Sequence, residues 1–189
     1  MSAPPKTSDS EILSAARRIL EANGLEAVTM QAVGHAVGIK APSLYKRYDS
    51  RNHLLRALSE QALGQLRTEL GCAALSRSAR KNVAQMAAVY RQFAKRSPRV
   101  YDLIYSGNRS PEFDPGTAPR HAASARLLEI LTGELDQRRA LPAARLLVAF
   151  LHGFVSMELS GAFRLGGDVD DAFEFGLRTI LDALFAHPS

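Results

Sequence analysis

Cationic and hydroxyl side chains cluster in residues 40–56, and such groups bind phosphate in proteins. Five lysine and arginine residues stand there against one acid, which gives a local charge of +4. The cations are Lys40, Lys46, Arg47, Arg51 and Arg56, and the acid is Asp49. Duplex DNA is a dense line of phosphates, so a basic strip gains affinity by releasing condensed counterions. Serine and tyrosine hydroxyls can add hydrogen bonds that fix the register. The cluster therefore predicts a nucleic acid as partner.

Two short helices around a glycine turn are expected to position this cluster. Thr29 is a candidate N-cap for the first helix, and Gly38 supplies the backbone freedom that the turn needs. The second helix starts around Pro42, a residue that suits the first helical position. Leu44 and Tyr48, four residues apart, can share its buried face. This order is typical of a helix-turn-helix.

The residues from Thr29 to Leu55 resemble the DNA-binding domain of TetR/AcrR-family transcriptional regulators. The resemblance covers about the first third of the chain. It rests on the following elements in order: a glycine and a hydrophobic residue (Gly38-Ile39), a small polar stretch (40–43), a Leu-Tyr pair (Leu44-Tyr45), an aromatic residue (Tyr48), and a cation (Arg51) before a leucine pair (Leu54-Leu55). Tyr48 stands where Phe is commoner and Arg51 where Lys is usual. A ring can still pack there, and a cation can still meet a phosphate.

The resemblance implies that the second helix, Pro42–Arg47, enters the major groove of DNA. Lys40, Lys46 and Arg47 are then expected to meet base edges or nearby phosphates. The side chains expected to hold the DNA backbone are those of Thr29, Ser43, Tyr45 and Arg51. The whole predicted contact set is Thr29, Lys40, Ala41, Pro42, Ser43, Tyr45, Lys46, Arg47 and Arg51.

The rest of the chain also predicts helices, because no strict apolar alternation is long enough for a strand. We expect an all-α fold of about nine helices, with a three-helix DNA-binding domain and a helical regulatory and dimerisation domain. Asp9 or Ser10 is the expected cap of the helix that begins the chain, before the helix-turn-helix. The predicted parts are a flexible arm (1–8), a helix-turn-helix domain (9–49), a connecting helix (50–70, ending near Gly71) and a helical domain (71–189). Within the last part, helices are expected over 78–96, 99–105, 120–135, 143–164 and 169–186, with a loop over 106–119 and a break at Leu141-Pro142.

The last two predicted helices carry more apolar surface than so small a domain can easily bury. A symmetric homodimer is the simplest partner, and two paired DNA-binding domains can read both halves of a palindrome. The residues expected at the dimer interface are Leu147, Phe150, Phe154, Phe173, Leu177, Ile180 and Leu184. The alternative is a monomer whose last two helices fill its own core.

The C-terminal part resembles a second domain, which some TetR-type regulators share and which is named for a Trp-His-Gly signature. Leu151 replaces the tryptophan here, while His152 and Gly153 remain. The resemblance implies a pocket for an unidentified small-molecule effector that lowers operator affinity. Its candidate lining residues are Tyr90, Phe93, Tyr101, Tyr105, His152 and Met157. The alternative is that aromatic residues at helical spacing are simply core.

Composition narrows the remaining classes of function. The single cysteine, Cys72, allows no internal disulfide and no cysteine-based zinc site, and is a small residue near a helix end or a reactive thiol. No signal peptide and no membrane span is evident, so we expect a cytoplasmic protein. No catalytic, cofactor or metal motif appears, and neither enzyme activity nor a cofactor is expected.

Two other functions remain open on the sequence alone. One is a helical adaptor dimer that binds an acidic protein through its basic domain, and the other is an all-α hydrolase or metal enzyme. Residues Arg77–Arg99 add seven cations and no acid. That segment is a solvated helix face balanced by Asp168, Asp170, Asp171 and Glu174, or else a site for an anionic effector or a second DNA contact.

Overall fold

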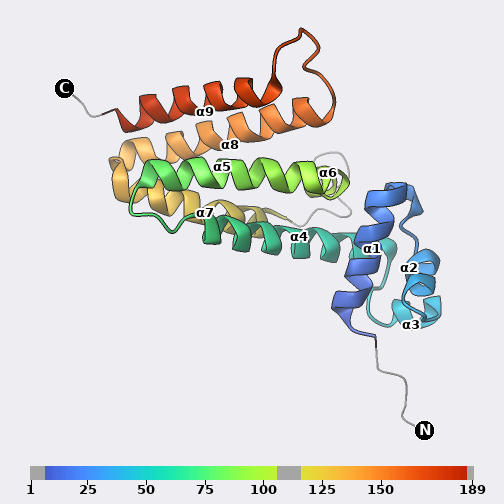
Figure 1. Cartoon of the computed structure of the whole chain (residues 1–189). Coiled ribbons are helices and arrows are strands. Elements are labelled where there is room, and N and C mark those ends of the chain that lie inside the picture. Colours follow the sequence, from blue (N-terminus) through green and yellow to red (C-terminus); the bar gives the residue numbers. More distant parts are fainter. Residues whose placement is uncertain (1–6, 106–115, 187–189) are drawn as a thin grey trace. The chain divides into compact units, whose positions relative to one another are not determined.

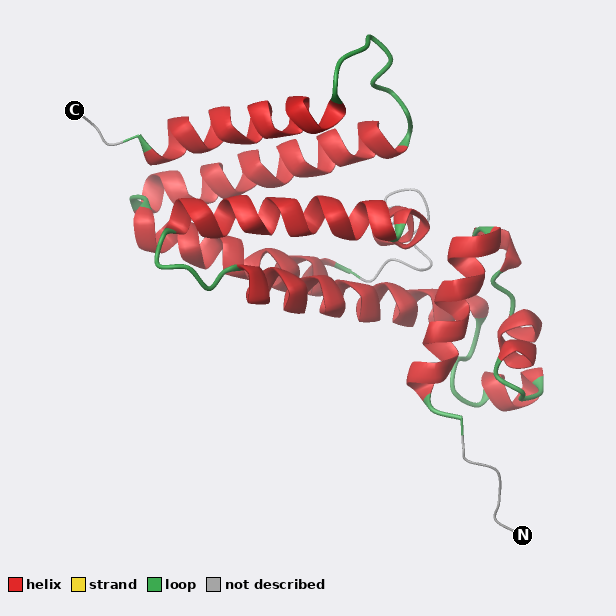
Figure 2. Cartoon of the chain, viewed as in Figure 1, coloured by secondary structure: helices red, strands yellow, loops and turns green. Residues whose placement is uncertain are grey.

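The computed structural model describes residues 7–105 and 116–186, which form helices joined by short turns, with no strand among them (Figure 1, Figure 2). The α-helices are α1 (Asp9–Asn23), α2 (Met30–Ala36), α3 (Ala41–Tyr45), α4 (Arg51–Ala73), α5 (Ala79–Arg96), α6 (Pro98–Tyr105), α7 (Thr117–Glu134), α8 (Gln137–Leu159) and α9 (Val169–Phe185). A short 3-10 helix, η1 (Leu25–Ala27), joins α1 to α2. The predicted all-α fold is confirmed. Most of the predicted arm and loop falls outside the described residues.

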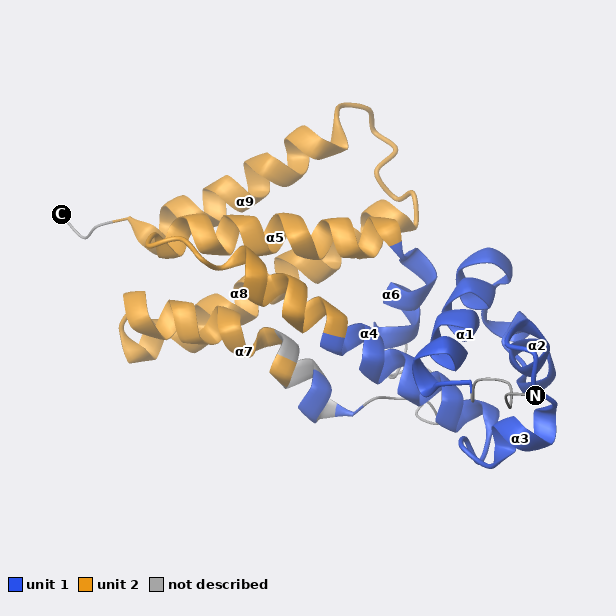
Figure 3. Cartoon of the chain, turned by 60° about the horizontal axis from the view of Figure 1, so that its bottom comes forward, with its two compact units in different colours: residues 1–64, 97–120 blue, residues 65–96, 121–189 orange. Residues whose placement is uncertain are grey.

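The chain divides into two compact units (Figure 3). Unit 1 comprises residues 1–64 and 97–120, and unit 2 comprises residues 65–96 and 121–189. The predicted domains had boundaries after residues 8, 49 and 70. In the structure, α4 is divided between the units and α6 belongs to unit 1, beside α1. The predicted domain boundaries stay a prediction.

The first helix is capped one or two residues earlier than predicted. Ser8, rather than Asp9 or Ser10, is the N-cap of α1 and forms a reciprocal capping box with Glu11. The Ser8 hydroxyl accepts from the Glu11 backbone N–H at 3.2 Å, and the Glu11 carboxylate accepts from the Ser8 N–H at 2.6 Å. These two bonds satisfy donors that a helix start otherwise leaves unpaired, which favours the earlier start.

Contacts between α1 and α6 explain why unit 1 includes a segment so distant in sequence. The Glu21 carboxylate accepts from the backbone N–H groups of Arg99 (3.3 Å) and Val100 (2.9 Å) at the start of α6. The Arg99 guanidinium donates in return to the Glu21 carbonyl at 2.9 Å. Arg17 donates to the Ser97 hydroxyl at 2.8 Å. These bonds tie the end of α1 to α6, a pairing that no local sequence pattern signals.

Several predicted helix boundaries are wrong. α8 begins at Gln137, because the Asp136 carboxylate accepts from the backbone N–H groups of Arg138 (2.9 Å) and Arg139 (3.0 Å). Pro142 therefore lies inside the helix instead of breaking it, at the cost of one backbone hydrogen bond. α8 also stops at Leu159, before the predicted end at residue 164, and α4 continues past Gly71 to Ala73.

A buried arginine organises unit 2, where α5, α8 and α9 run side by side (Figure 1). Arg91 on α5 is only 9% exposed, and its Nε and Nη2 atoms donate to the Glu158 carboxylate at 2.8 and 2.7 Å. Nη2 also donates to Asp170 at 2.6 Å, and Lys95 lies 3.1 Å from Glu158. Two cations thus meet two carboxylates, so the buried charge is compensated. The cluster joins α5 to the end of α8 and the start of α9.

Aromatic packing completes the contact between α8 and α9. The Arg91 guanidinium carbon lies 4.6 Å from the centroid of the Phe173 ring. Phe150 stacks on Phe173 with 5.8 Å between centroids, and its ring covers the backbone of α9 at Gly176. A Cβ atom at Gly176 would lie 2.7 Å from the Phe150 ring, so a larger residue there would force that ring to move.

α8 is also long and apolar enough to cross a membrane by length and composition, with a mean hydropathy of 1.5 over its most apolar window. Charged residues nevertheless interrupt its apolar run, as expected from the sequence, and the absence of a membrane span stays a prediction. One such helix is weak support for a membrane span, since core helices pass the same test. Only 33% of that window is buried within the chain, so α8 keeps apolar surface for a partner.

The ion cluster predicts how unit 2 responds to Glu158→Gln. Glutamine can still accept a hydrogen bond but leaves Arg91 without its main counter-charge, so we expect a loss of about 2 kcal/mol in the free energy of unfolding at pH 7. Urea denaturation followed by circular dichroism measures it. Glu174→Gln, an exposed change on α9, is the matched control.

The stability difference between wild type and Glu158→Gln should depend on pH. The Arg91 guanidinium lowers the pKa of Glu158 below its ordinary value of 4.5, through direct hydrogen bonds. A carboxylate with a depressed folded pKa contributes stability above its unfolded pKa, and the contribution is lost as pH falls through the folded value. The stability gap between wild type and Glu158→Gln should therefore shrink below about pH 4.5. A gap that stays constant from pH 7 to pH 3 would contradict the assignment.

Candidate nucleic-acid interface

Thr29 starts the motif as predicted. Its hydroxyl oxygen accepts from the Ala32 backbone N–H at 3.0 Å, so Thr29 is the N-cap of α2. This bond uses the oxygen as an acceptor and leaves the hydroxyl hydrogen to donate. An exposed threonine at this position can therefore cap the helix and donate to an external acceptor such as a phosphate.

The turn between α2 and α3 depends on two glycines. Gly38 has a φ of +71°, which confirms its predicted role in the turn. Gly34 was not predicted to matter, yet its backbone is in direct contact with the turn. The Ile39 N–H donates to the Gly34 carbonyl at 2.9 Å, and a Cβ atom at Gly34 would lie 2.9 Å from the Ile39 carbonyl oxygen. The sequence did contain a signal for this role, because Gly34 lies inside a seven-residue helix and four residues before the turn glycine, Gly38.

Helix α3 presents one face to the core and another to solvent. Leu44 is fully buried and Tyr48 is 6% exposed, so both are buried as predicted, but Tyr48 lies three residues beyond the end of α3 and not on its face. Pro42 lies in the first turn of the helix, also as predicted. Tyr45 is 51% exposed. The other exposed side chains of the predicted contact set here are those of Lys40, Pro42, Ser43 and Lys46, with Ala41 partly exposed. α3 ends at Tyr45, so Lys46 and Arg47 follow the helix.

Arg47 is held by an acid from α1. Its Nη1 atom lies 3.0 Å from the Asp9 carboxylate, and the two side chains are 25% and 69% exposed. Exposed ion pairs contribute about 0–1 kcal/mol, so a phosphate or base edge could displace Asp9 at little cost. Arg47 is therefore positioned at the edge of the motif rather than fixed within the core.

Arg51 turns toward its own unit. Its Nε atom donates to the Val28 carbonyl at 2.8 Å, and Nη2 donates to the Leu25 carbonyl at 2.6 Å. Nη2 also lies 3.7 Å from the Glu26 carboxylate, and the Arg51 side chain is 31% exposed. In this structure Arg51 therefore binds the backbone around η1. Its contact with DNA stays a prediction.

The basic segment Arg77–Arg99 is largely neutralised by acids from other parts of the chain. Arg80 lies 2.6 Å from Asp182, and Arg96 lies 2.9 Å from Glu69. Arg91 and Lys95 share the Glu158 and Asp170 carboxylates, and Arg99 binds carbonyl groups of α1. Of the four acids predicted to balance the segment, Asp170 does so. The pairing favours the interpretation as a helix face over an anion site.

The six predicted ligand residues have different environments. Tyr90 and Phe93 are buried on α5 of unit 2, while Tyr101 is buried on α6 and Tyr105 is partly buried there, both in unit 1. His152 is partly exposed, and burial lowers the pKa of its imidazole. Met157 is 48% exposed. The burial of the aromatic residues fits the core alternative, and ligand contact stays a prediction.

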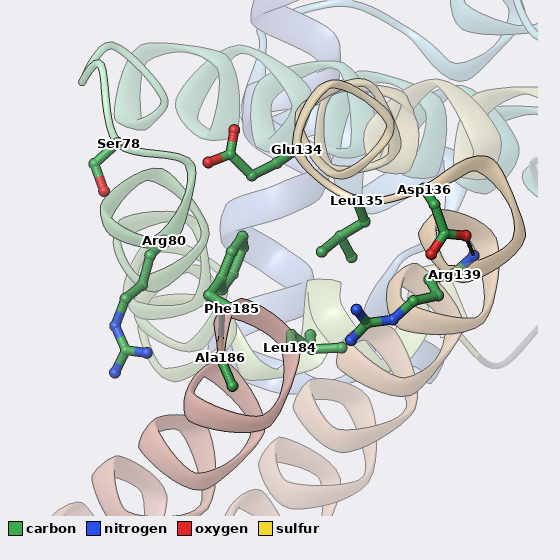
Figure 4. A pocket seen from close by; sticks show the side chains of 9 residues that line it. All are labelled: Ser78, Arg80, Glu134, Leu135, Asp136, Arg139, Leu184, Phe185 and Ala186. Carbon is green, nitrogen blue, oxygen red and sulfur yellow. Dashed lines mark hydrogen bonds between the residues drawn. The ribbon is translucent and has the colours of Figure 1, made fainter. Parts of the chain in front are cut away.

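Two hollows in the described part of unit 2 are lined by other residues. A groove of about 760 Å³ lies between α5 and α9, over Ala84, Ala88, Phe173 and Leu177, with Arg91 and Lys95 among its polar lining. A second hollow, of about 310 Å³, is drawn in Figure 4. Its lining residues are Ser78, Arg80, Glu134, Leu135, Asp136, Arg139, Leu184, Phe185 and Ala186. None of the six predicted ligand residues lines either hollow.

The predicted dimer residues divide into two groups. Leu147, Phe173 and Leu177 are at most 8% exposed within one chain, so they pack mainly inside it, and their part in a dimer stays a prediction. The remaining four, Phe150, Phe154, Ile180 and Leu184, are partly exposed. The large apolar side chains most exposed on α8 and α9 are instead Phe175 (63%), Leu146 (50%) and Met157 (48%). The most apolar stripe of each helix faces its own core, and the candidate interface is the stripe beside it.

A glycine-dependent helix-turn-helix with exposed cations, followed by a helical second unit, defines a class of DNA-binding transcriptional regulators. Residues 12–58 match the family model "Bacterial regulatory proteins, tetR family", and residues 83–180 match "Tetracyclin repressor-like, C-terminal domain". The chain belongs to the TetR family of transcriptional regulators and is not an enzyme. The Trp-His-Gly subtype stays a prediction.

Relatives and solved structures agree with this assignment. The chain is 32% identical over 162 residues to the HTH-type transcriptional regulator Rv0681 of Mycobacterium tuberculosis, covering 84% of this chain and 73% of that protein. It is 24% identical to YobS of Bacillus subtilis, covering 92% and 90%. Its fold is similar to those of TetR from Acinetobacter baumannii AYE (TM-score 0.73, 19% identity, 94% and 96% covered) and BioQ of Mycobacterium smegmatis (TM-score 0.71, 20% identity, 97% and 100% covered).

The close approach at Gly34 predicts the effect of Gly34→Ala. The added Cβ would meet a backbone carbonyl that cannot rotate away, so the turn must open and α3 must shift. We expect a loss of about 1–3 kcal/mol in stability, and a loss of DNA affinity of about tenfold or more beyond it. Gly71→Ala, in a helical position with nothing within 4 Å of the added atom, is the control and should be neutral or stabilising. Equal effects of the two changes, measured by urea denaturation and fluorescence anisotropy with labelled duplex DNA, would refute the proposed constraint.

Proposed function

We propose that this chain is a cytoplasmic, ligand-responsive repressor that binds a palindromic operator as a homodimer. The observation that carries this proposal is the arrangement of α3. Leu44 within the helix and Tyr48 just after it are buried in the core, while Tyr45 and the C-cap residue Lys46 are exposed. A short helix fixed from behind and polar in front suits insertion into the major groove.

The predicted contact residues have distinct roles in this proposal. Lys40, Lys46 and Arg47 meet base edges or adjacent phosphates, with Arg47 leaving Asp9 to do so. Thr29, Ser43 and Tyr45 donate hydroxyl hydrogens to backbone phosphates, which sets the register. Ala41 and Pro42 begin α3 with small, uncharged side chains. Such side chains allow the start of the helix to approach the bases.

Dimerisation supplies the second DNA-binding unit. One short recognition helix reads only a few base pairs, whereas two related by a two-fold axis read a palindrome. The exposed apolar side chains of α8 and α9, Phe175 and Leu146 among them, support a second copy of this chain as partner. A symmetric pairing of these two helices would cover both stripes at once.

An unidentified small molecule is proposed to control operator affinity. A single-residue variant of TetR from Acinetobacter baumannii AYE, 21% identical over 94% of this chain with a TM-score of 0.67, was solved in complex with minocycline. That fold therefore accommodates a small organic molecule. At saturation, an effector changes operator affinity by the ratio of its own affinities for the free dimer and for the DNA-bound dimer. Tyr90, Phe93, Tyr101, Tyr105, His152 and Met157 stay the candidate contacts.

Selection of bound duplexes from a random DNA pool tests the central proposal. Wild-type protein should enrich a palindrome, and its affinity should fall steeply with salt. A helical adaptor for an acidic protein would show no sequence preference. Failure to enrich any sequence would overturn the proposed function.

Variants of α3 then test the residue roles on the selected duplex. Tyr45→Phe removes only a hydroxyl and should weaken all sequences similarly, by about threefold to tenfold. Lys46→Ala should relax the sequence preference at one position in each half-site if it reads a base, or lower the salt dependence if it binds phosphate. Lys81→Ala removes an exposed cation from α5 and is the charge-matched control. Unchanged affinity in both α3 variants would show that α3 is not the docking surface.

A further inference from the structure

The two bonds of Arg51 connect the first turn of α4 to the chain just before α2. Arg51 is the first residue of α4, and its acceptors are the Leu25 and Val28 carbonyls at 2.6 and 2.8 Å. Leu25 belongs to η1, and Val28 directly precedes Thr29, the N-cap of α2. Arg51 therefore holds the point where α2 begins. We call this pair of bonds the Arg51 latch.

Arg51 adds donors to two carbonyls of this segment, which η1 is too short to satisfy fully. A single 3-10 turn leaves most of its carbonyls without a helical partner. The Leu25 carbonyl also accepts from the Val28 N–H at 3.1 Å, while Val28 itself is fully buried. A buried carbonyl without a donor costs about 1–3 kcal/mol. A charged, two-pronged donor on α4 avoids this cost.

The position of Arg51 makes a phosphate contact unfavourable. Its Nε and one Nη2 hydrogen are used by the carbonyls, and the Glu26 carboxylate lies 3.7 Å from Nη2. A phosphate that bound Nη2 would lie beside this carboxylate, whose side chain is 92% exposed. Like charges so close repel, which weakens any such contact.

We propose that Arg51 is a positioning residue of the DNA-binding unit, which fixes the start of α2 to the first turn of α4 instead of clamping a phosphate. This proposal rests on the proposed function and revises one of its predicted contacts. Thr29 is the residue after Val28, so the Arg51 latch also sets the position of a predicted phosphate donor. A displacement of the first turn of α4 is carried directly to α2 and, through the Gly34–Ile39 contact, to α3.

Arg51→Lys separates the two roles because it keeps the charge. A guanidinium presents two donors in a rigid plane, whereas an ammonium presents all its donors from one atom and cannot reproduce the paired geometry. A phosphate clamp tolerates lysine, which binds phosphate as a point charge. The Arg51 latch does not tolerate it.

The probe is the duplex selected by wild-type protein, titrated by anisotropy at several salt concentrations. We expect Arg51→Lys to lose about tenfold in affinity with an unchanged salt slope, since α2 is no longer held while no phosphate contact is lost. Arg51→Ala should also keep the slope. Arg67→Lys, an exposed change on the same helix, should bind as wild type does.

Two results would overturn the proposal. Wild-type affinity in Arg51→Lys, together with a slope reduced by about one per subunit in Arg51→Ala, would identify a phosphate clamp. A lower melting temperature with unchanged DNA affinity in both variants would identify a structural role that does not position the reading helices.

Amide hydrogen exchange tests the Arg51 latch without DNA, so that its failure can be told from failure of the proposed function. In the free protein, Arg51→Lys should speed exchange in residues 29–36 and leave α5 and α8 unchanged, because the loosened segment lies in unit 1. Unchanged exchange in residues 29–36 would refute the latch even if the wild-type protein binds its operator. Faster exchange in a protein that selects no DNA would leave the latch standing and refute only the proposed function.

Discussion

The direct contact between the backbone of α2 and the turn that follows it determines where α3 can lie. Gly34 accepts a hydrogen bond from the Ile39 N–H at 2.9 Å, and no side chain fits between the two segments. Close packing of this kind has few alternative arrangements, because any separation leaves a void or an unpaired amide. The exposed cations that flank α3, Lys40 and Lys46, owe their position to this contact. Leu44 and Tyr48 then hold the helix from the core side.

Unit 2 solves a comparable problem with charge instead of a close backbone contact. Arg91 reaches Glu158 at the end of α8 and Asp170 at the start of α9, so one side chain orients three helices. Hydrogen bonds to charged groups are directional, and a buried arginine tolerates few other geometries. The apolar stripes of α8 and α9 can therefore stay partly exposed without the helices rearranging to bury them. Such a rigid, incompletely covered surface suits association with a second copy.

Local signals in the sequence predicted the helices and the motif, but not the contacts between distant segments. Thr29, Gly38 and Pro42 act within a few residues of their own positions, and their roles were predictable. The attachment of α6 to α1 depends on Glu21 and Arg99, which are far apart in the chain. The burial of three predicted dimer residues within one chain was not predictable for a related reason: helical periodicity identifies the most apolar stripe, and the fold decides whether that stripe faces the chain or a partner.

Counting charges along the sequence overstates how much of the basic cluster can act on DNA. The local charge of +4 over residues 40–56 includes Arg47, paired with Asp9, and Arg51, which binds carbonyls beside Glu26. The two acids, Asp9 and Glu26, lie outside residues 40–56. Because each phosphate contact contributes to affinity through counterion release, a single unit with this reduced set binds DNA weakly. Pairing the DNA-binding units of two chains would double the number of phosphate contacts without adding a cation to either chain. It would also make DNA affinity depend on the spacing of the two DNA-binding units. In the proposed dimer, a protein with few available cations would gain both strength and control, since a change in spacing would disengage one of the two units.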